Sequence, residues 1–215
     1  MNTHLTAPLS VVKSFNSWNT NKQAGDWELC VPYPGSTYNF SQIKKIVKSV
    51  QTAFPWGDRY NIEIAFTNYS PHYNSLPDND IDKWLQQLEE KDDSFNGIKI
   101  EIFSPIITDS YLNQTEFLDQ GIKILCDLPH KDGAFDILIS VPVNLYTDRI
   151  WVKNIDTHES EEVDIAAFAR HNRQLLRESL QKFESEMGGV IKHWYSELGI
   201  SGIERYGYSE NAKEL

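Results

Sequence analysis

The stretch IKILCDLPHKDGAFDILISV, residues 122–141, decides the fold more than any other part of the chain. Apolar residues alternate with other residues in both halves, at positions 122, 124, 126 and 128 and again at 135, 137, 139 and 141. A period of two is typical of a β-strand with one buried face. Between the halves, the Asp132-Gly133 step favours a tight reversal of the chain. The stretch therefore predicts an antiparallel hairpin, and we expect a sheet to extend from it.

Four further segments are predicted to be strands. Tyr60–Phe66 and Ile98–Ile102 show the same alternation, with charged or amide side chains on the outward face. Trp27–Tyr33 also alternates, and Pro32 places it at a sheet edge because proline has no backbone N–H to donate to a neighbouring strand. Arg149–Lys153 is the sixth candidate strand.

Apolar residues recur at helical spacing in two segments of the first half. The stripe over residues 43–54 follows Ser41, a residue type that caps helix N-termini, and Pro55 ends it. A shorter helix is predicted over Asp80–Glu90, where the apolar side chains again share one face.

A third helix is predicted from Glu161 to Leu198, with a bend at Gly188-Gly189. Together with the strands it predicts an α+β fold: a single domain over residues 1–215, with a mixed, mostly antiparallel sheet of about six strands, helices packed on one face and a long C-terminal helix. A doubly wound parallel sheet is disfavoured because its strands are buried on both faces and would not alternate. We expect the other face to be at least partly exposed to water, carrying Glu28, Asn61, Glu63, Lys99, Glu101, Lys123, Asp127 and Asp136.

The net charge of -11 is concentrated in two short segments. Asp78–Asp93 holds seven acids and two lysines, and Asp156–Asp164 holds five acids and no base. Such a field repels nucleic acid phosphates and anionic lipids, and it attracts a basic protein partner. The candidate partner-binding residues are Asp78, Asp80, Asp82, Glu89, Glu90, Asp92, Asp93, Asp156, Glu159, Glu161 and Glu162.

Both acidic segments also have a structural interpretation. Glu161, Glu162 and Asp164 would begin the third helix, where acids near the positive end of the helix dipole stabilise it by about 0.3–1 kcal/mol each. The acids of Asp78–Asp93 would be a solvated helix face with an N-terminal cap.

Arg170, Arg173 and Arg177 form a stripe on the third predicted helix. Their spacing of three and four residues projects them within about 60° of one another. None has Asp or Glu three or four residues away, so their counter-charges must come from another element, a bound anion or water. The stripe is therefore a candidate for an alternative anion-binding site, beside pairing with another element or exposure to water.

No catalytic or metal-binding motif is complete in the sequence. The glycine patterns that hold phosphates or dinucleotides are absent, and the segment Gly199-Ile200-Ser201-Gly202 lacks the spacing of a nucleophile elbow and is interpreted as a helix stop. The six histidines are not spaced to share a metal, so we expect no metal and no cofactor. Cys30 and Cys126 form neither a disulfide framework nor a redox motif.

The location of the protein is predicted from two stretches of sequence. Residues 1–10 do not resemble a secretory signal. The longest apolar stretch, Ile137–Tyr146, is about half of the roughly 20 residues that a membrane-spanning helix needs. We therefore expect a cytoplasmic protein without a membrane partner.

These observations favour a non-catalytic acidic protein-binding module, in particular an inhibitor such as an immunity protein that neutralises a basic toxin or enzyme. The alternative is a small-molecule-binding domain, or an enzyme, with an anionic ligand held by the three arginines in a pocket between the sheet and the third helix. A third interpretation is a homo-oligomeric structural protein.

Overall fold

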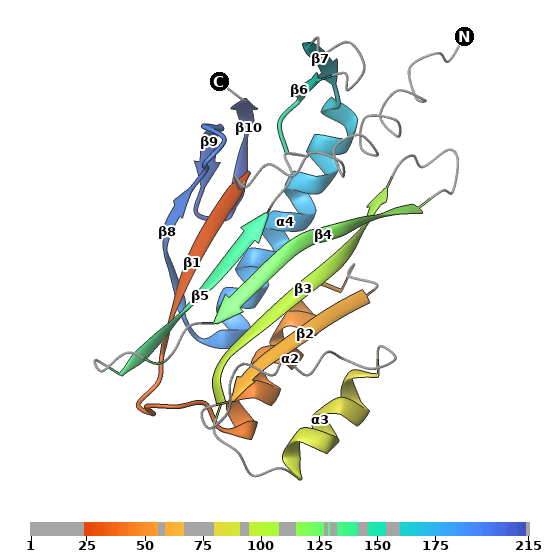
Figure 1. Ribbon diagram of the computed structural model, residues 1–215. Coiled ribbons are helices and arrows are strands. Elements are labelled where there is room, and N and C mark those ends of the chain that lie inside the picture. The colour runs from red at the N-terminus through yellow and green to blue at the C-terminus, as the bar shows by residue number, and fades with distance from the viewer. Residues whose placement is uncertain are drawn as a thin grey trace.

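One six-stranded antiparallel sheet forms the centre of the computed structural model, which describes residues 24–55, 59–66, 80–90, 95–107, 115–126, 129, 133–141, 146–153 and 160–213. The strand order is β2-β3-β4-β5-β1-β8. The strands are β1 (Gly25–Pro32), β2 (Arg59–Phe66), β3 (Phe95–Ile107), β4 (Thr115–Cys126), β5 (Ala134–Val141) and β8 (Val190–Tyr195). The helices of the described chain are α2 (Phe40–Ala53), α3 (Ile81–Glu89) and α4 (Ala166–Met187). Figure 1 shows α4 behind β4 and β5, so the predicted α+β fold with helices on one face is confirmed.

The hairpin predicted from residues 122–141 is formed by β4 and β5. Ile124 lies opposite Ile139 and Cys126 opposite Ile137, so the alternating apolar side chains of both strands share one face. Gly133 adopts a left-handed φ of 82°, which glycine reaches without a steric penalty. Of the connecting loop, only Pro129 and Gly133 belong to the described residues.

The core lies between this face of the sheet and the helices. Isoleucines of β2, β3, β4 and β5 form continuous rows in which each side chain is at most 1% exposed: Ile62, Ile64, Ile98, Ile100, Ile122, Ile124, Ile137 and Ile139. The helical stripes close the core from the other side, with Ile43, Ile46, Val47 and Val50 on α2 and Leu176, Leu180, Phe183 and Met187 on α4. The apolar side chains that recur every 2 residues on the strands thus pack against those that recur about every 3.6 residues on the helices.

Local polar side chains begin the first two helices. The Asn39 side chain accepts a hydrogen bond from the Gln42 backbone N–H at 2.9 Å and caps α2. Ser41, the predicted cap, lies inside the helix instead. Asp80 caps α3 by accepting from the Lys83 backbone N–H at 3.0 Å, as an N-cap carboxylate does.

The prediction of one long helix from Glu161 to Leu198 is wrong at both ends. The residues before α4 form β7 (Ser160–Asp164), and those after it form β8. Gly188 ends the helix in a left-handed conformation with φ 68°, and its N–H bonds the carbonyls of Glu184 and Ser185. The chain then reverses and pairs with β1. The apolar residues of β8 continue the helical spacing of α4, so periodicity alone did not separate the helix from the strand.

The edge position predicted for Pro32 is also wrong, because β1 lies inside the sheet between β5 and β8. The proline is tolerated because it is the last residue of the strand. β8 pairs with β1 only over Asp26–Cys30, so no β8 residue lies opposite Pro32.

The remaining strands, β6 (Arg149–Lys153), β9 (Ser201–Glu204) and β10 (Gly207–Lys213), lie outside the main sheet. β6 is a strand as predicted, but it pairs only with β7 in a separate two-stranded sheet. The sixth strand of the main sheet is β8 instead. β9 and β10, which were not predicted, form a second two-stranded sheet. The Gly199–Gly202 segment, predicted as a helix stop, leads from β8 into β9.

The outer face of the main sheet carries the polar residues predicted for it, with different degrees of exposure. Glu28, Lys99, Lys123 and Asp136 are partly exposed. Glu101 is 8% exposed and is held by the Asn61 amide at 3.0 Å and by Lys99 at 3.1 Å. Burial opposes its ionisation, but these hydrogen bonds and charges keep the pKa of Glu101 below its usual value. Asp127 and the Glu63 side chain lie outside the described residues.

Candidate functional site

The acidic residues of α3 divide between structural and exposed positions. Asp80 is the helix cap. Asp82 accepts a hydrogen bond from Lys48 Nζ of α2 at 2.6 Å, and this bond lowers the pKa of Asp82. Glu89 and Glu90 are exposed at the end of the helix. Asp78, Asp92 and Asp93 lie outside the described residues.

The second acidic segment does not begin a helix, because α4 starts at Ala166 and its first turn contains no acid. Glu161 and Glu162 belong to β7, where Glu162 accepts from the Arg149 guanidinium at 3.0 Å. Asp164 accepts from the Ala166 backbone N–H at 2.9 Å and so contributes to the start of α4. Asp156 and Glu159 lie outside the described residues.

The described parts of the two acidic segments lie at opposite ends of the molecule. Figure 1 shows α3 below the sheet and the β6 and β7 strands above it. At most one of these described parts therefore belongs to a single standard interface, which covers about 800 Å² on each partner.

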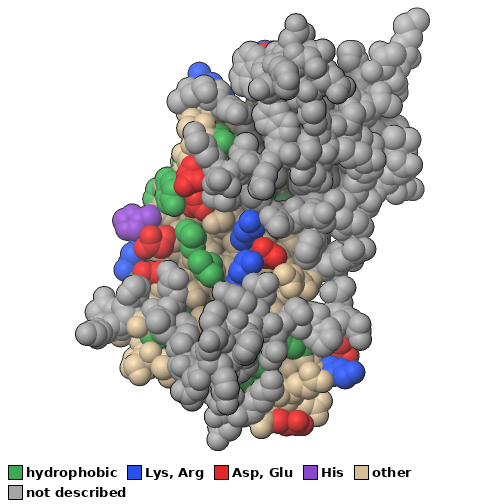
Figure 2. All heavy atoms as spheres, in the orientation of Figure 1, with side chains coloured by type: hydrophobic (Ala, Val, Ile, Leu, Met, Phe, Trp, Pro, Cys, Tyr) green, Lys and Arg blue, Asp and Glu red, His purple; other side chains and the backbone are tan. Residues whose placement is uncertain are grey.

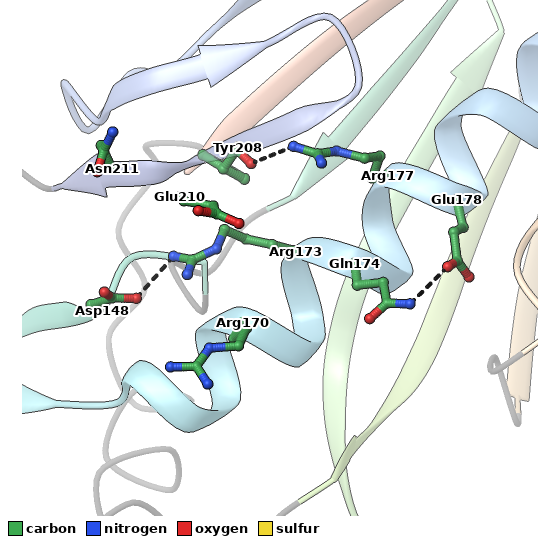
Figure 3. A pocket seen from close by; sticks show the side chains of 9 residues that line it. All are labelled: Asp148, Arg170, Arg173, Gln174, Arg177, Glu178, Tyr208, Glu210 and Asn211. Atoms are coloured by element: carbon green, nitrogen blue, oxygen red, sulfur yellow. Dashed lines mark hydrogen bonds and ion pairs between the residues drawn. The ribbon is translucent and has the colours of Figure 1, made fainter.

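The three arginines of α4 line one pocket of about 600 Å³, which we call the arginine pocket (Figure 3). Its lining residues are Asp148, Arg170, Arg173, Gln174, Arg177, Glu178, Tyr208, Glu210 and Asn211. They come from the turn before β6, from α4 and from β10. The pocket thus lies between α4 and the small β10 strand, not between α4 and the main sheet as predicted.

Arg173 and Arg177 are bound to other elements of the fold. Arg173 is buried, with 8% exposure, and its Nη1 donates to the Tyr146 carbonyl at 2.9 Å and to Asp148 at 3.0 Å. Arg177 donates to the Tyr208 carbonyl at 3.4 Å and lies 3.7 Å from a Glu204 carboxylate oxygen. These two arginines therefore take their counter-charges from other elements of the fold, which was one of the three possibilities left by the sequence.

Arg170 differs from its two neighbours on the stripe. It is exposed, and it forms no hydrogen bond or ion pair with the part of the chain that the structure describes. Figure 3 shows its guanidinium on the same side of α4 as that of Arg173.

Sequence reasoning missed the residues from other elements that line this pocket. Asp148, Tyr208, Glu210 and Asn211 lie more than 20 residues from the stripe, and β10 has no clear strand pattern because it buries only Gly207, Tyr208 and Ala212. No local spacing signals their approach to α4. The aromatic cluster of Tyr208 with Trp27 and Tyr146, at centroid distances of 5.5 and 4.9 Å, helps to hold β10 there.

A second candidate site is the free edge of the main sheet at β8. Among the described residues no strand pairs with the outer side of β8. Three of its side chains are large, apolar and exposed: Val190 at 49%, Trp194 at 39% and Tyr195 at 49%. Figure 2 shows hydrophobic side chains along this margin of the sheet beside acidic side chains, a histidine and a basic side chain.

Carboxylates surround Tyr195 on the outer face. Burial raises the pKa of the Tyr195 hydroxyl, and the charges of Asp26, Glu197 and Glu28 raise it further. Asp26 lies opposite Tyr195 in the β1–β8 register and accepts a hydrogen bond from the Ser140 hydroxyl. We call Val190, Trp194 and Tyr195, together with Glu28 and Glu197, the β8 surface.

The described residues also bear on membrane and metal binding. No helix among them is long and apolar enough to cross a membrane. They contain no group of three or more His, Cys, Asp or Glu side chains placed to hold a metal ion.

Comparison of the chain with protein-family models, with curated proteins and with solved structures finds no match.

Proposed function

We propose that this protein is a non-catalytic binding module that takes a basic protein partner at the β8 surface. In this proposal it acts in the cytoplasm as an inhibitor, such as an immunity protein that neutralises a basic toxin or enzyme. The observation that carries the proposal is a strand edge that no described strand pairs with, where Val190, Trp194 and Tyr195 are exposed next to carboxylates.

The edge itself supports protein binding. An unpaired strand offers a row of backbone N–H and C=O groups on which another chain can add a strand. Natural proteins usually protect such an edge with charges, proline or a covering segment. In β8 two aromatics and a valine are exposed beside Lys192 and His193.

The side chains at the edge support a protein partner rather than a small ligand. Buried aromatic residues, especially Trp and Tyr, contribute most of the binding energy in protein interfaces. Trp194 and Tyr195 are neighbours on β8, so they point to the two faces of the sheet and both flank the edge.

The charges support a basic partner. Glu28 and Glu197 lie close enough to Tyr195 to act on its hydroxyl, as does the buried Asp26. A lysine or arginine of the partner can pair with these carboxylates and stack on the aromatic rings. The net charge of -11 brings such a partner to the molecule faster.

The proposal is tested by affinity capture with a tagged chain from its native lysate at low and at about 0.5 M salt, where exposed ion pairs are strongly screened. We expect the wild type to capture one stoichiometric basic protein, with less bound at high salt. Trp194→Ala combined with Tyr195→Ala should weaken binding of this protein by about 30-fold or more, as loss of a hot spot does.

Leu125→Ala is the matched control. Leu125 is also a large apolar side chain, 42% exposed, but it lies on β4, three strands away from β8. The control should bind the partner like the wild type, and circular dichroism should show all variants folded. A partner retained in full by the Trp194 and Tyr195 variant would refute the β8 surface. Purification of the wild type alone at both salts, with the partner expressed, would refute the proposed function.

A further inference from the structure

The arginine pocket contains two opposite charges without partners among the described residues. Arg170 lines it from α4 and Glu210 lines it from β10. Neither side chain forms a hydrogen bond or an ion pair with any residue that the structure describes, although other charged side chains in the pocket do. The pocket therefore presents one available cation and one available anion to a ligand.

Arg173 adds a fixed donor beside Arg170. Its side chain is 9% exposed, and both of its hydrogen bonds, to Tyr146 and Asp148, use Nη1. A guanidinium carries five N–H donors, so these bonds orient the group without exhausting it. Together, Arg170 and Arg173 offer the paired donors that a carboxylate accepts.

The overall charge of the lining limits the class of ligand. Three arginines are balanced by three carboxylates, those of Asp148, Glu178 and Glu210, so the pocket has no net charge. The carboxylate of Glu210 in the same lining repels a multiply charged anion and so opposes its binding. A ligand with a negative and a positive end avoids that cost.

We infer that the arginine pocket binds a small dipolar ligand of the α-amino acid class, with its carboxylate on Arg170 and Arg173 and its ammonium group on Glu210. The volume of about 600 Å³ falls within the range of small-molecule sites and leaves room for the ligand's side chain. The pocket and the β8 surface share no residue, so this inference stands independently of the proposed function.

Thermal unfolding of the full chain tests the inference. Each of the proteinogenic L-amino acids is added at about 10 mM, since a ligand that binds only the folded state raises the melting temperature. Sodium acetate, inorganic phosphate and methylammonium chloride serve as probes with one kind of charge. We expect at least one amino acid to raise the melting temperature of the wild type and the three single-charge probes to leave it unchanged.

Three variants assign the effect to the pocket. Arg170→Ala should abolish the shift and Glu210→Gln should reduce it, whereas Lys182→Ala, an exposed site on the same helix outside the pocket, should keep it. The inference is overturned if no amino acid stabilises the wild type, or if the shift survives in both pocket variants. It is also overturned if acetate or phosphate stabilises the wild type and Glu210→Gln enlarges that shift, which would indicate a simple anion site.

Discussion

Glu184 shows how one side chain can hold several elements together. Its carboxylate accepts hydrogen bonds from the Arg205 guanidinium and the Ile191 backbone N–H, both at 2.6 Å, and from the Tyr206 hydroxyl. These partners belong to β8 and to the turn between β9 and β10, whereas Glu184 is on α4. Burial opposes its ionisation, but the hydrogen bonds keep the pKa of Glu184 below its usual value.

Glu184→Gln should lower the free energy of unfolding by about 1–3 kcal/mol at pH 7, because charge-assisted hydrogen bonds are lost. A lowered pKa in the folded state stabilises the protein above the unfolded-state pKa, and this stability disappears as the pH falls through the folded-state pKa. The gap between variant and wild type should therefore close on acidification.

Urea unfolding at several pH values measures this gap. Glu186→Gln, an exposed acid on the same helix, is the control and should unfold like the wild type at every pH. A gap that is independent of pH would contradict the role given to the Glu184 charge.

At the scale of elements, the reversal from α4 into β8 depends on two glycines with different roles. Gly188 needs its left-handed φ of 68°, but a side chain there would meet no atom within 4 Å. A Cβ on Gly189 would lie 2.6 Å from the Cys30 carbonyl oxygen and 2.9 Å from Leu29 Cδ1. The close approach to β1 therefore excludes any side chain at Gly189.

Gly188→Ala should cost about 1 kcal/mol of stability, the penalty for a left-handed alanine. Gly189→Ala should cost more, about 2–3 kcal/mol, because the backbone of β1 or β8 must move. Chemical unfolding of both variants gives the comparison. Equal losses, or a larger loss for Gly188→Ala, would contradict the close packing of β8 against β1.

These elements also show what the sequence does and does not predict. The β4–β5 hairpin, β2, α2 and α3 were predicted because their apolar periods are set by local burial. The prediction of one long helix is wrong because the apolar residues of β8 keep the helical spacing of α4 across Gly188. Only the pairing with β1, between residues at least 160 positions apart, makes the segment a strand.

For the candidate sites, too, the sequence predicts features that lie within one element and misses those that depend on contacts between distant elements. The arginine stripe was predicted from its spacing on one helix, and all three side chains line one pocket. Glu210, Asp148 and the β8 surface were not predicted, since each depends on contacts between distant elements. The acidic segments were recognised as clusters in the sequence, but the fold separates them.

At the scale of the whole molecule, the acids of α3 lie far from β8. Figure 1 places α3 beyond the β2 edge of the sheet, and β8 is the opposite edge. These acids can therefore act on a partner bound at β8 only through the long-range electrostatic field of the protein. Such a field changes the rate of association and leaves dissociation almost unchanged.

Replacing Glu89, Glu90, Asp92 and Asp93 with Gln or Asn should slow association of the captured partner by about three- to tenfold at low salt. Dissociation should stay at the wild-type rate, whereas Trp194→Ala should speed it. Surface plasmon resonance at low and at about 0.5 M salt separates the two rates. Faster dissociation of the α3 variant would instead place α3 in direct contact with the partner.

The most direct test of the proposed function is hydrogen–deuterium exchange of the full chain with and without its captured partner. Among the described strands none pairs with the outer side of β8, so we expect its outward backbone amides to exchange until a partner strand covers them. We predict slower exchange over residues 190–195 in the complex. Unchanged exchange there, with protection confined to α3 or to the β6 and β7 strands, would contradict binding at the β8 surface.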